Sequence, residues 1–162
     1  MPVSSNVRPH KQPPRPAQAT MNPNTFLEST IPYLEAFAEF DLSRRFDLLS
    51  RAMTPSAEIW GPKRVFTGYA EISEKIDGFH KNWPDCRLVF TAGPNTFLNV
   101  ARFGCAIINS TRETFASGES IVELAEDGRY QRVIPFWEVL PALPAKWPEH
   151  LQPKQGKPKS AA

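Results

Sequence analysis

The sequence predicts an α+β domain with three N-terminal helices packed on a curved antiparallel sheet. Apolar residues recur at helical spacing up to Trp83, and a period of two replaces that spacing from there to residue 140. Eleven of the 17 prolines fall in residues 1–23 and 141–162. We therefore expect one domain over residues 24–140, a disordered proline-rich tail before it and a proline- and lysine-rich tail after it.

The two expected tails also carry the positive charge of the chain. Residues 24–140 hold twelve basic and sixteen acidic side chains, so the formal net charge of +2 comes from the tails. A nucleic-acid-binding domain would gather basic residues on its folded face, so we expect no nucleic-acid partner. The chain has neither a membrane-length apolar run nor the apolar stretch of a signal peptide, which favours a cytoplasmic protein with no membrane partner. Met21 offers a second translation start that would spare the domain.

Motifs that bind metals or cofactors are missing from the sequence. Cys86 and Cys105 lie in apolar surroundings without a CxxC pattern or a histidine at ligand spacing, so we interpret them as reduced core thiols. No GxGxxG pattern, P-loop or HExxH motif occurs. The sequence therefore predicts no metal site and no cofactor.

The first helix is expected to begin at Thr25, with Glu28 completing a capping box, or at Ser29 or Thr30. The later start would place Pro32 in the first turn, where its missing N–H does no harm. The predicted apolar face consists of Leu27, Ile31, Leu34 and Ala38, with Tyr33, Phe37 and Phe40 on the neighbouring face.

A second helix is expected to begin at Asp41 or Ser43 and to form a hairpin with the first. Its apolar residues recur at helical spacing as far as Met53, and Thr54-Pro55 should end it. Two short strands, 57–60 and 64–67, follow with a turn at Gly61-Pro62 between them.

The third helix and the long strands complete the predicted domain. Tyr69, Ile72, Ile76 and Phe79 keep helical spacing until Trp83-Pro84. The strands expected after it are 87–90, 97–109, 114–124 and 130–140. Pro94 should lie in a loop between the first two of these strands, and Glu126-Asp127-Gly128 in a hairpin turn between the last two. Pro135 falls within the last strand, where proline requires an edge, a bulge or a lost ladder bond.

This order of elements resembles the cone-shaped fold of the nuclear transport factor 2-like (NTF2-like) superfamily, in particular its SnoaL-like members. Five segments carry the resemblance: Phe46-Asp47-Leu48-Leu49, residues 53–59, Thr67-Gly68-Tyr69-Ala70-Glu71-Ile72, residues 118–129 and Phe136-Trp137-Glu138. The superfamily includes ketosteroid isomerase-like and polyketide cyclase-like enzymes, dehydratases and non-catalytic binders. The resemblance therefore implies the fold and leaves the activity open.

The resemblance also implies that any chemistry takes place inside the cone. In ketosteroid isomerase-like members the general base is an aspartate immediately before a proline at the end of the first strand, and here that residue is Gly61. The helix-one tyrosine of those members matches a position near Phe37, with Tyr33 one turn earlier, and their strand acid matches Ser120. A glycine cannot accept a proton, so we expect no steroid isomerase chemistry by this route. Tyr33 and Ser120 can still donate hydrogen bonds to a ligand oxygen.

Strand alternation predicts the lining of a pocket in this cone. If Ser120 faces inward, so do alternate residues of its own strand and of the strands beside it. The predicted pocket consists of Tyr33, Phe37, Ile76, Cys105, Ile107, Asn109, Ser120, Val122, Val133 and Trp137. An ordinary filled core has the same composition. The opposite alternation would bury Glu119, Glu123 and Glu138 without partners, at a large cost in free energy.

Four residues are candidates for a catalytic role: Tyr33, Asn109, Ser120 and His80. His80 is the single histidine of residues 24–140, and it follows Ile76 by one helical turn. An imidazole there could act as a general base near neutral pH. No partner residue is fixed by sequence spacing, which is more typical of a partly exposed residue at a helix end.

These observations support two functional hypotheses. The first is a protein that binds a small apolar, oxygen-bearing molecule in its cone and acts on it as a cofactor-independent isomerase, cyclase or dehydratase. The alternative is a non-catalytic ligand-binding or dimerisation module, with a homodimer formed through the sheet. A cavity of several hundred Å³ with a desolvated acid or base would favour the enzyme, and a filled cone would exclude it.

Overall fold

The structure, a computed structural model, describes residues 23–137, 146 and 148–151. Its elements are α1 Pro23–Ala36, α2 Leu42–Ala52, β1 Met53–Trp60, β2 Val65–Thr67, α3 Gly68–Asn82, β3 Arg87–Phe97, β4 Val100–Ile108, β5 Thr114–Leu124, β6 Tyr130–Phe136 and the short 3-10 helix η1 Glu149–Leu151. Residues 1–22, Met21 among them, most of residues 141–162 and residues 138–140 lie outside the described residues. No helix in the described part of the chain is long and apolar enough to cross a membrane.

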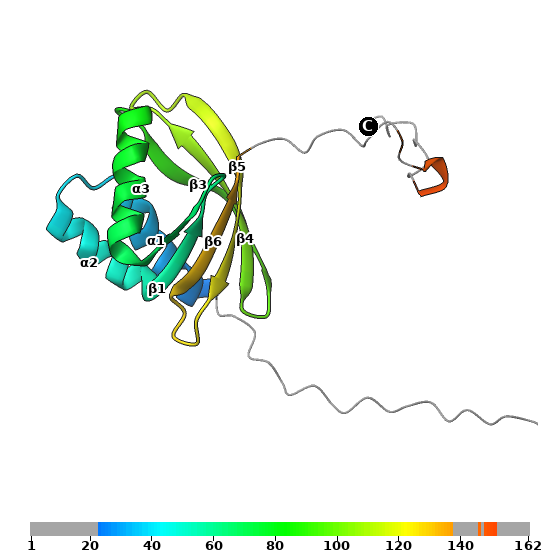
Figure 1. Ribbon diagram of the computed structural model, residues 1–162, viewed down its shortest axis with the longest axis horizontal. Helices are drawn as coiled ribbons and strands as arrows, with labels where there is room; N and C mark the ends of the chain where they lie inside the picture. The colour runs from blue at the N-terminus through cyan, green and yellow to red at the C-terminus, as the bar shows by residue number, and fades with distance from the viewer. Residues whose placement is uncertain (1–22, 138–145, 147, 152–162) are drawn as a thin grey trace, which may run out of the picture.

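Six strands form one curved sheet in the order β2-β1-β6-β5-β4-β3, and the helices cover its concave face (Figure 1). Neighbouring strands are antiparallel except β1 and β6, which pair in parallel through Glu58 with Arg132 and Ile59 with Val133. This parallel pairing joins the short β1–β2 hairpin to the four-stranded meander. Only α1 and α2 precede the sheet in sequence, because α3 lies between β2 and β3.

The face of α1 that is buried differs from the predicted one. Leu27 and Ile31 are 42% and 53% exposed, whereas Phe26, Tyr33 and Phe37 are buried against the sheet. These three aromatic rings follow each other at spacings of seven and four residues, so they lie on one side of the helix. The prediction of a Leu27–Ile31 face was wrong because the wide cone accepts the larger aromatic side chains of the neighbouring face.

Two polar residues of α1 are buried on the same side and are paired. The Thr30 hydroxyl shares a hydrogen bond with the Tyr130 hydroxyl at 2.5 Å, and Ser29 Oγ donates to the carbonyl oxygen of Gly128 at 2.8 Å. Buried hydroxyl groups are tolerated when they find such partners. The two contacts fix α1 against the β5–β6 hairpin.

The boundary between α2 and β1 lies before the predicted stop at Pro55. Asp41 caps α2 as expected, since its carboxylate accepts from the Arg44 amide at 2.9 Å. Met53, predicted to be helical, is the first residue of β1. Pro55 therefore lies inside a strand, where the pairing with β6 shifts register between Met53 and Glu58. Such an irregularity accommodates a proline, because no ladder hydrogen bond is required there.

The predicted loop around Pro94 is wrong as well. β3 continues through Gly93 and Pro94 to Phe97, with two register shifts against β4. β3 is an edge strand of the sheet, and edge strands tolerate proline because one side of the ladder is unpaired. The strand predicted over residues 97–109 therefore begins at Val100.

The sequence pattern gives the bounds of β5 and the start of β6 at Tyr130. β6 ends at Phe136, short of the predicted residue 140: Trp137 is outside the strand, and residues 138–140 lie outside the described residues. Pro135 pairs with Ser120 on the β5 side, while the pairing with β1 ends at Val133. On its β1 side Pro135 has no strand beside it, so its missing N–H removes no bond to β1.

Candidate functional site

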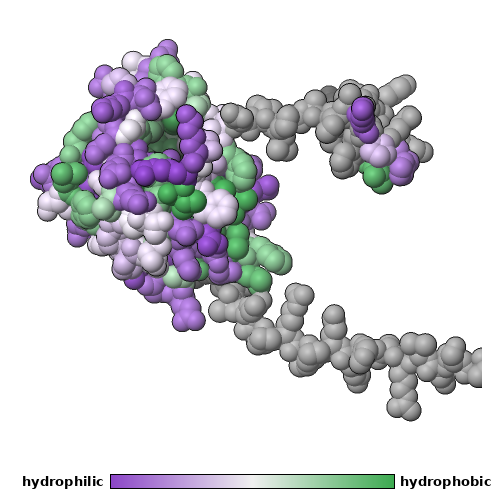
Figure 2. All heavy atoms as spheres, in the orientation of Figure 1, coloured by the Kyte–Doolittle hydropathy of each residue, from purple (hydrophilic) through white to green (hydrophobic). Residues whose placement is uncertain are grey.

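A cavity of about 470 Å³ lies between α3 and the inner face of the sheet. Its apolar wall is formed by Phe37, Ile59, Phe66, Phe79, Leu88, Trp83, Ile107 and Trp137. Figure 2 shows this face of the molecule hollowed between α3 and the sheet, with green hydrophobic residues inside and purple hydrophilic residues around the rim. The size and the apolar lining are typical of a small-molecule site.

Small side chains explain why the cone is empty here. Gly78 of α3 and Ala116, Ser120 and Pro135 of the sheet region all line the cavity, and a Cβ atom at Gly78 would meet nothing within 4 Å. We call these four residues the hollow end of the cone. No large side chain occupies this space, so the curvature of the sheet leaves a void that a ligand can fill.

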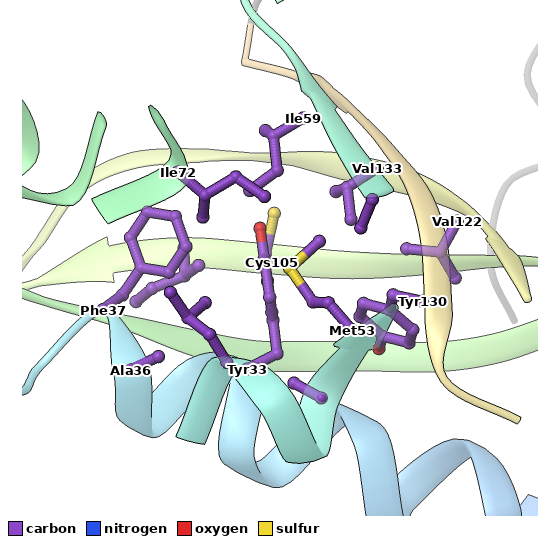
Figure 3. Packing of buried hydrophobic residues seen from close by; sticks show 14 of the residues in the cluster. Tyr33, Ala36, Phe37, Met53, Ile59, Ile72, Cys105, Val122, Tyr130 and Val133 are labelled. Carbon is purple, nitrogen blue, oxygen red and sulfur yellow. The ribbon is translucent and has the colours of Figure 1, made fainter. Parts of the chain in front are cut away.

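Tyr33 lies at the floor of the cavity, where it is 3% exposed. Its hydroxyl points toward the Cys105 sulfur (Figure 3) and forms no hydrogen bond to another described residue. Burial, followed by the neighbouring Tyr130 and Cys105, raises the pKa of the Tyr33 hydroxyl far above its usual range. The phenol therefore stays protonated at neutral pH and can donate a hydrogen bond into the cavity.

Ser120 lies at the same floor and contacts Cys105 of the core cluster. The Ser120 hydroxyl is 3.6 Å from Cys105 Sγ, and either group could be the donor. Burial raises the pKa of the Cys105 thiol, the hydrogen bond with Ser120 lowers it, and the Glu119 charge raises it again. The net rise keeps this thiol protonated and unreactive at neutral pH, so Ser120 is a second hydroxyl facing the cavity beside a neutral thiol.

Charged groups of the cavity lie at its rim on α3. Glu74 is exposed and pairs with Arg64, at 3.1 Å between Arg64 Nη2 and Glu74 Oε2. Lys75 is half-buried, and its Nζ lies 4.8 Å from the centroid of the Phe66 ring. Burial lowers the pKa of Lys75, and the residue forms no ion pair within the described part of the chain.

Lys75 is not among the predicted pocket residues, although its spacing carries a signal. Lys75 follows Ile72 by three residues and precedes Phe79 by four, so it shares the inward side of α3 with them. Ile72 and Phe79 predict only the apolar face of the helix, and the side chain between them was not assigned to the pocket. Ile59 and Phe66 were missed because the parallel pairing of β1 with β6, which brings them to the cavity, leaves no mark in the local pattern.

The residue that replaces the expected aspartate, Gly61, also lies near this rim. A Cβ atom at Gly61 would be 3.1 Å from Phe66 Cε2 and 3.8 Å from Lys75 Nζ. A side chain at this position would therefore press on Phe66 and reach the lysine amine. The glycine leaves Phe66 in place and leaves the Lys75 amine without a neighbouring carboxylate.

The predicted pocket residues divide into two groups. Tyr33, Phe37, Ile107, Ser120 and Trp137 line the cavity. The second group, Ile76, Cys105, Val122 and Val133, is buried in the core cluster and does not line the cavity. Figure 3 shows that Cys105, Val122 and Val133 point into this core from the sheet. Strand alternation thus places all of these strand residues on the inner face but does not say where that face is filled.

Asn109 and His80, two of the four catalytic candidates, lie away from the cavity. Asn109 Nδ2 donates to Glu113 Oε2 at 2.9 Å in the turn after β4. His80 Nε2 is 2.8 Å from the carbonyl oxygen of Phe37, and its ring stacks on Phe40 at 4.1 Å between centroids. Both side chains have structural partners, Asn109 within a turn and His80 between α3 and the end of α1. Among the described residues, no three His, Cys, Asp or Glu side chains form a group that could hold a metal ion.

Comparison with known proteins extends the description of the fold. No family model and no curated protein matches the sequence. A proposed isomerase of the SnoaL-like family from Agrobacterium tumefaciens is similar in structure, with 26% identity, a TM-score of 0.64 and coverage of 72% of this chain and 99% of that chain. A protein of unknown function with a cystatin-like fold from Methylobium petroleophilum has 14% identity, a TM-score of 0.59 and coverage of 76% and 82%.

A third similar structure is a proposed SnoaL-like polyketide cyclase from Jannaschia. It has 11% identity, a TM-score of 0.55 and coverage of 78% of this chain and 90% of that chain. The helices and the six-stranded curved sheet, with the cavity between them, define an α+β cone. Together with these likenesses they show that the chain has the NTF2-like fold in its SnoaL-like form.

Proposed function

We propose that the protein binds a small apolar molecule in the cavity and that the Tyr33 hydroxyl holds an oxygen atom of that molecule. The observation that carries this proposal is the position of that hydroxyl: Tyr33 is 3% exposed, lines the cavity and forms no hydrogen bond to another described residue. A ligand oxygen at this place would accept a hydrogen bond from the phenol, with a net contribution of about 0.5–1.5 kcal/mol.

The walls of the cavity define the remaining part of the ligand. Ile107, Leu88 and Phe79 offer apolar contact, and Trp137 closes the side formed by the end of β6. Ser120, whose hydroxyl contacts Cys105 Sγ, provides a second hydroxyl in the cavity lining. The ligand class that fits is an apolar, largely hydrocarbon body with a carbonyl or hydroxyl oxygen at its inner end.

A matched pair of ligands tests this proposal. We would measure the shift in melting temperature caused by 2-acetylnaphthalene and by 2-ethylnaphthalene, which have similar shapes and differ in the carbonyl oxygen. The wild type should be stabilised more by the ketone, and Tyr33→Phe should lose that preference because only the hydroxyl is removed. Trp137→Ala should respond to neither ligand. Equal responses of the wild type and Trp137→Ala would mean that the ligands bind elsewhere.

A cofactor-independent isomerase, cyclase or dehydratase is the second candidate function. What supports it is the likeness at 26% identity to a proposed isomerase, together with a neutral phenol that could stabilise an oxyanion formed from a ligand carbonyl. Incubating a bound ketone in deuterated water and following deuterium uptake next to the carbonyl by NMR tests this candidate. Uptake above the buffer rate that Tyr33→Phe removes would support an enzyme. A ligand recovered without deuterium would assign the protein to the non-catalytic binders.

A homodimer through the sheet is the proposed assembly. Ile121, Ile134 and Phe136 lie on the outer face of β5 and β6, because their neighbours Ser120, Val122, Val133 and Pro135 face inward, and Phe136 is 53% exposed. Exposed apolar residues on a sheet face favour association. Analytical ultracentrifugation should give twice the chain mass for the wild type and a lower mass for Phe136→Arg. A wild type that sediments as a monomer would contradict the dimer.

A further inference from the structure

We infer that the ligand carries an anionic group, a carboxylate, at its outer end, and that Lys75 pairs with this group at the mouth of the cavity. The inference rests on the proposed function, since it takes the same cavity as the binding site. It adds the charge of the ligand and its orientation: the apolar body and the neutral oxygen point toward Tyr33, and the anion points toward α3.

The burial of the lining residues gives the cavity two different ends. Tyr33, Ser120 and Ile59 are almost fully buried, so they form the floor. Glu74 and Asn82 are exposed, which places the mouth along α3. Lys75 lies on the same helix and is half-buried, so its amine can contact the outer part of a ligand without reaching the floor.

The charges around the mouth leave one cation free in the described part of the chain. Arg64 and Glu74 neutralise each other in their ion pair. Lys75 Nζ contacts the face of the Phe66 ring, which compensates a cation only in part. The ammonium group has three donors and no carboxylate partner among the described residues. A partly desolvated cation gains most from an anion that enters the same space.

The glycine at position 61 supports the pairing of Lys75 with an anionic group of the ligand. A side chain at this position would begin 3.8 Å from Lys75 Nζ, so an acidic residue there would give the lysine an internal partner. With glycine at position 61, Lys75 has no such partner there. The cation therefore remains available to a carboxylate of the ligand.

The experiment compares an acid with its ester, because the two share the apolar body and differ in charge. Dissociation constants of 2-naphthylacetate and methyl 2-naphthylacetate would be measured by isothermal titration calorimetry for the wild type, Lys75→Met and Lys81→Met. Lys81 is an exposed lysine on the same helix, so its replacement is the matched control for the loss of one positive charge.

The wild type should bind the acid roughly fivefold to tenfold more tightly than the ester, the range expected for a partly screened charged hydrogen bond. Lys75→Met should bind both equally, and Lys81→Met should keep the preference. Added salt should weaken the binding of the acid and leave that of the ester unchanged. No preference in the wild type, or a preference that survives in Lys75→Met, would overturn the inference.

The same titrations with Trp137→Ala separate this inference from the proposed function. If both probes bind the wild type equally and fail to bind Trp137→Ala, the cavity is the binding site, and the inference that the ligand has an anionic outer end is wrong. If both probes bind Trp137→Ala as tightly as the wild type, the cavity is not the site and the proposed function fails as well. A wild type that binds neither probe contradicts both.

Discussion

The two ends of the same cone are built from side chains of very different size. At one end, Phe26, Phe90, Phe103 and Tyr130 fill the space between α1 and the sheet, with Phe26 5.7–6.3 Å from the other three ring centroids. We call this cluster the filled end. At the hollow end the corresponding space faces Gly78, Ala116, Ser120 and Pro135, and a cavity of about 470 Å³ remains.

The contrast shows that the curvature of the sheet determines the volume between the sheet and the helices. The size of the side chains that line this volume determines how much of it stays empty. β6 contributes to both ends, with Tyr130 at its start in the filled end and Pro135 near its finish in the hollow end. Stability should therefore depend on the filled end, and ligand binding on the hollow end. Substitutions can test this division.

Phe26→Ala should have the largest effect on stability. The side chain is 0% exposed and contacts three aromatic rings. Removing it leaves a cavity, which should lower the free energy of unfolding by about 3–5 kcal/mol, as for other buried aromatic residues. Urea denaturation followed by circular dichroism measures the change.

Leu27→Ala is the control for Phe26→Ala, since it lies on the same helix and is 42% exposed. It should change the free energy of unfolding by well under ~1 kcal/mol. Similar losses in the two variants would mean that α1 contributes through its helical propensity and that the filled end has no special weight.

The next effect is expected from the two tyrosine hydroxyl groups. Tyr130→Phe removes the hydrogen bond with Thr30 and should cost about 1 kcal/mol. Tyr33→Phe removes a hydroxyl that has no partner among the described residues, so the free energy of unfolding should stay the same or rise slightly. Thermal unfolding of both variants without ligand measures the difference. A loss in Tyr33→Phe equal to that in Tyr130→Phe would mean that the Tyr33 hydroxyl has a structural partner.

Much of this fold could be predicted from local patterns. β5, the end of α3 and the hairpin around Gly128 follow from strand alternation, from Trp83-Pro84 and from a glycine with a positive φ of 84°. The strand irregularities at Pro55 and Pro94 were missed. A proline predicts a break in the ladder, and the sequence does not show whether the strand continues beyond that break.

The candidate site was predicted less completely than the fold. Ser120 follows from alternation on β5 and Tyr33 from the resemblance, whereas Trp137 lines the cavity from one residue beyond the end of β6 at Phe136. Lys75 and Phe66 depend on how α3 and β2 lie across the sheet, which is a tertiary property. Asn109 was placed by extending β4 one residue beyond its end at Ile108, so the alternation no longer applied to it.

Gly78→Ala should raise stability at the hollow end by a smaller amount. Gly78 lies inside α3, and a Cβ atom there meets nothing within 4 Å. Alanine in place of glycine within a helix stabilises the folded state by about 0.5–1 kcal/mol. Chemical denaturation should show this gain, whereas Gly78→Leu should fill part of the cavity and weaken ligand binding. A loss of stability in Gly78→Ala would mean that the cavity is closed at this point.

The smallest effect concerns pH and Lys75. Burial lowers its pKa in the folded protein, so between that pKa and the ordinary value of about 10.4 the unfolded chain binds more protons. The stability contributed by this residue should therefore rise with pH across that window. Other groups titrate in the same window, the Cys105 thiol among them, and their effects cancel when the wild type is compared with Lys75→Met.

The quantity to measure is the free energy of unfolding of the wild type minus that of Lys75→Met, from neutral pH to about pH 10. The difference should increase with pH, because the cost of burying the charged amine disappears once the amine is neutral. Arg64 and Glu74, the charged groups nearest the rim, are paired with each other and are present in both proteins. A difference that does not change with pH would show that the Lys75 amine is hydrated. The hollow end would then be open enough at its mouth for water to solvate a cation there.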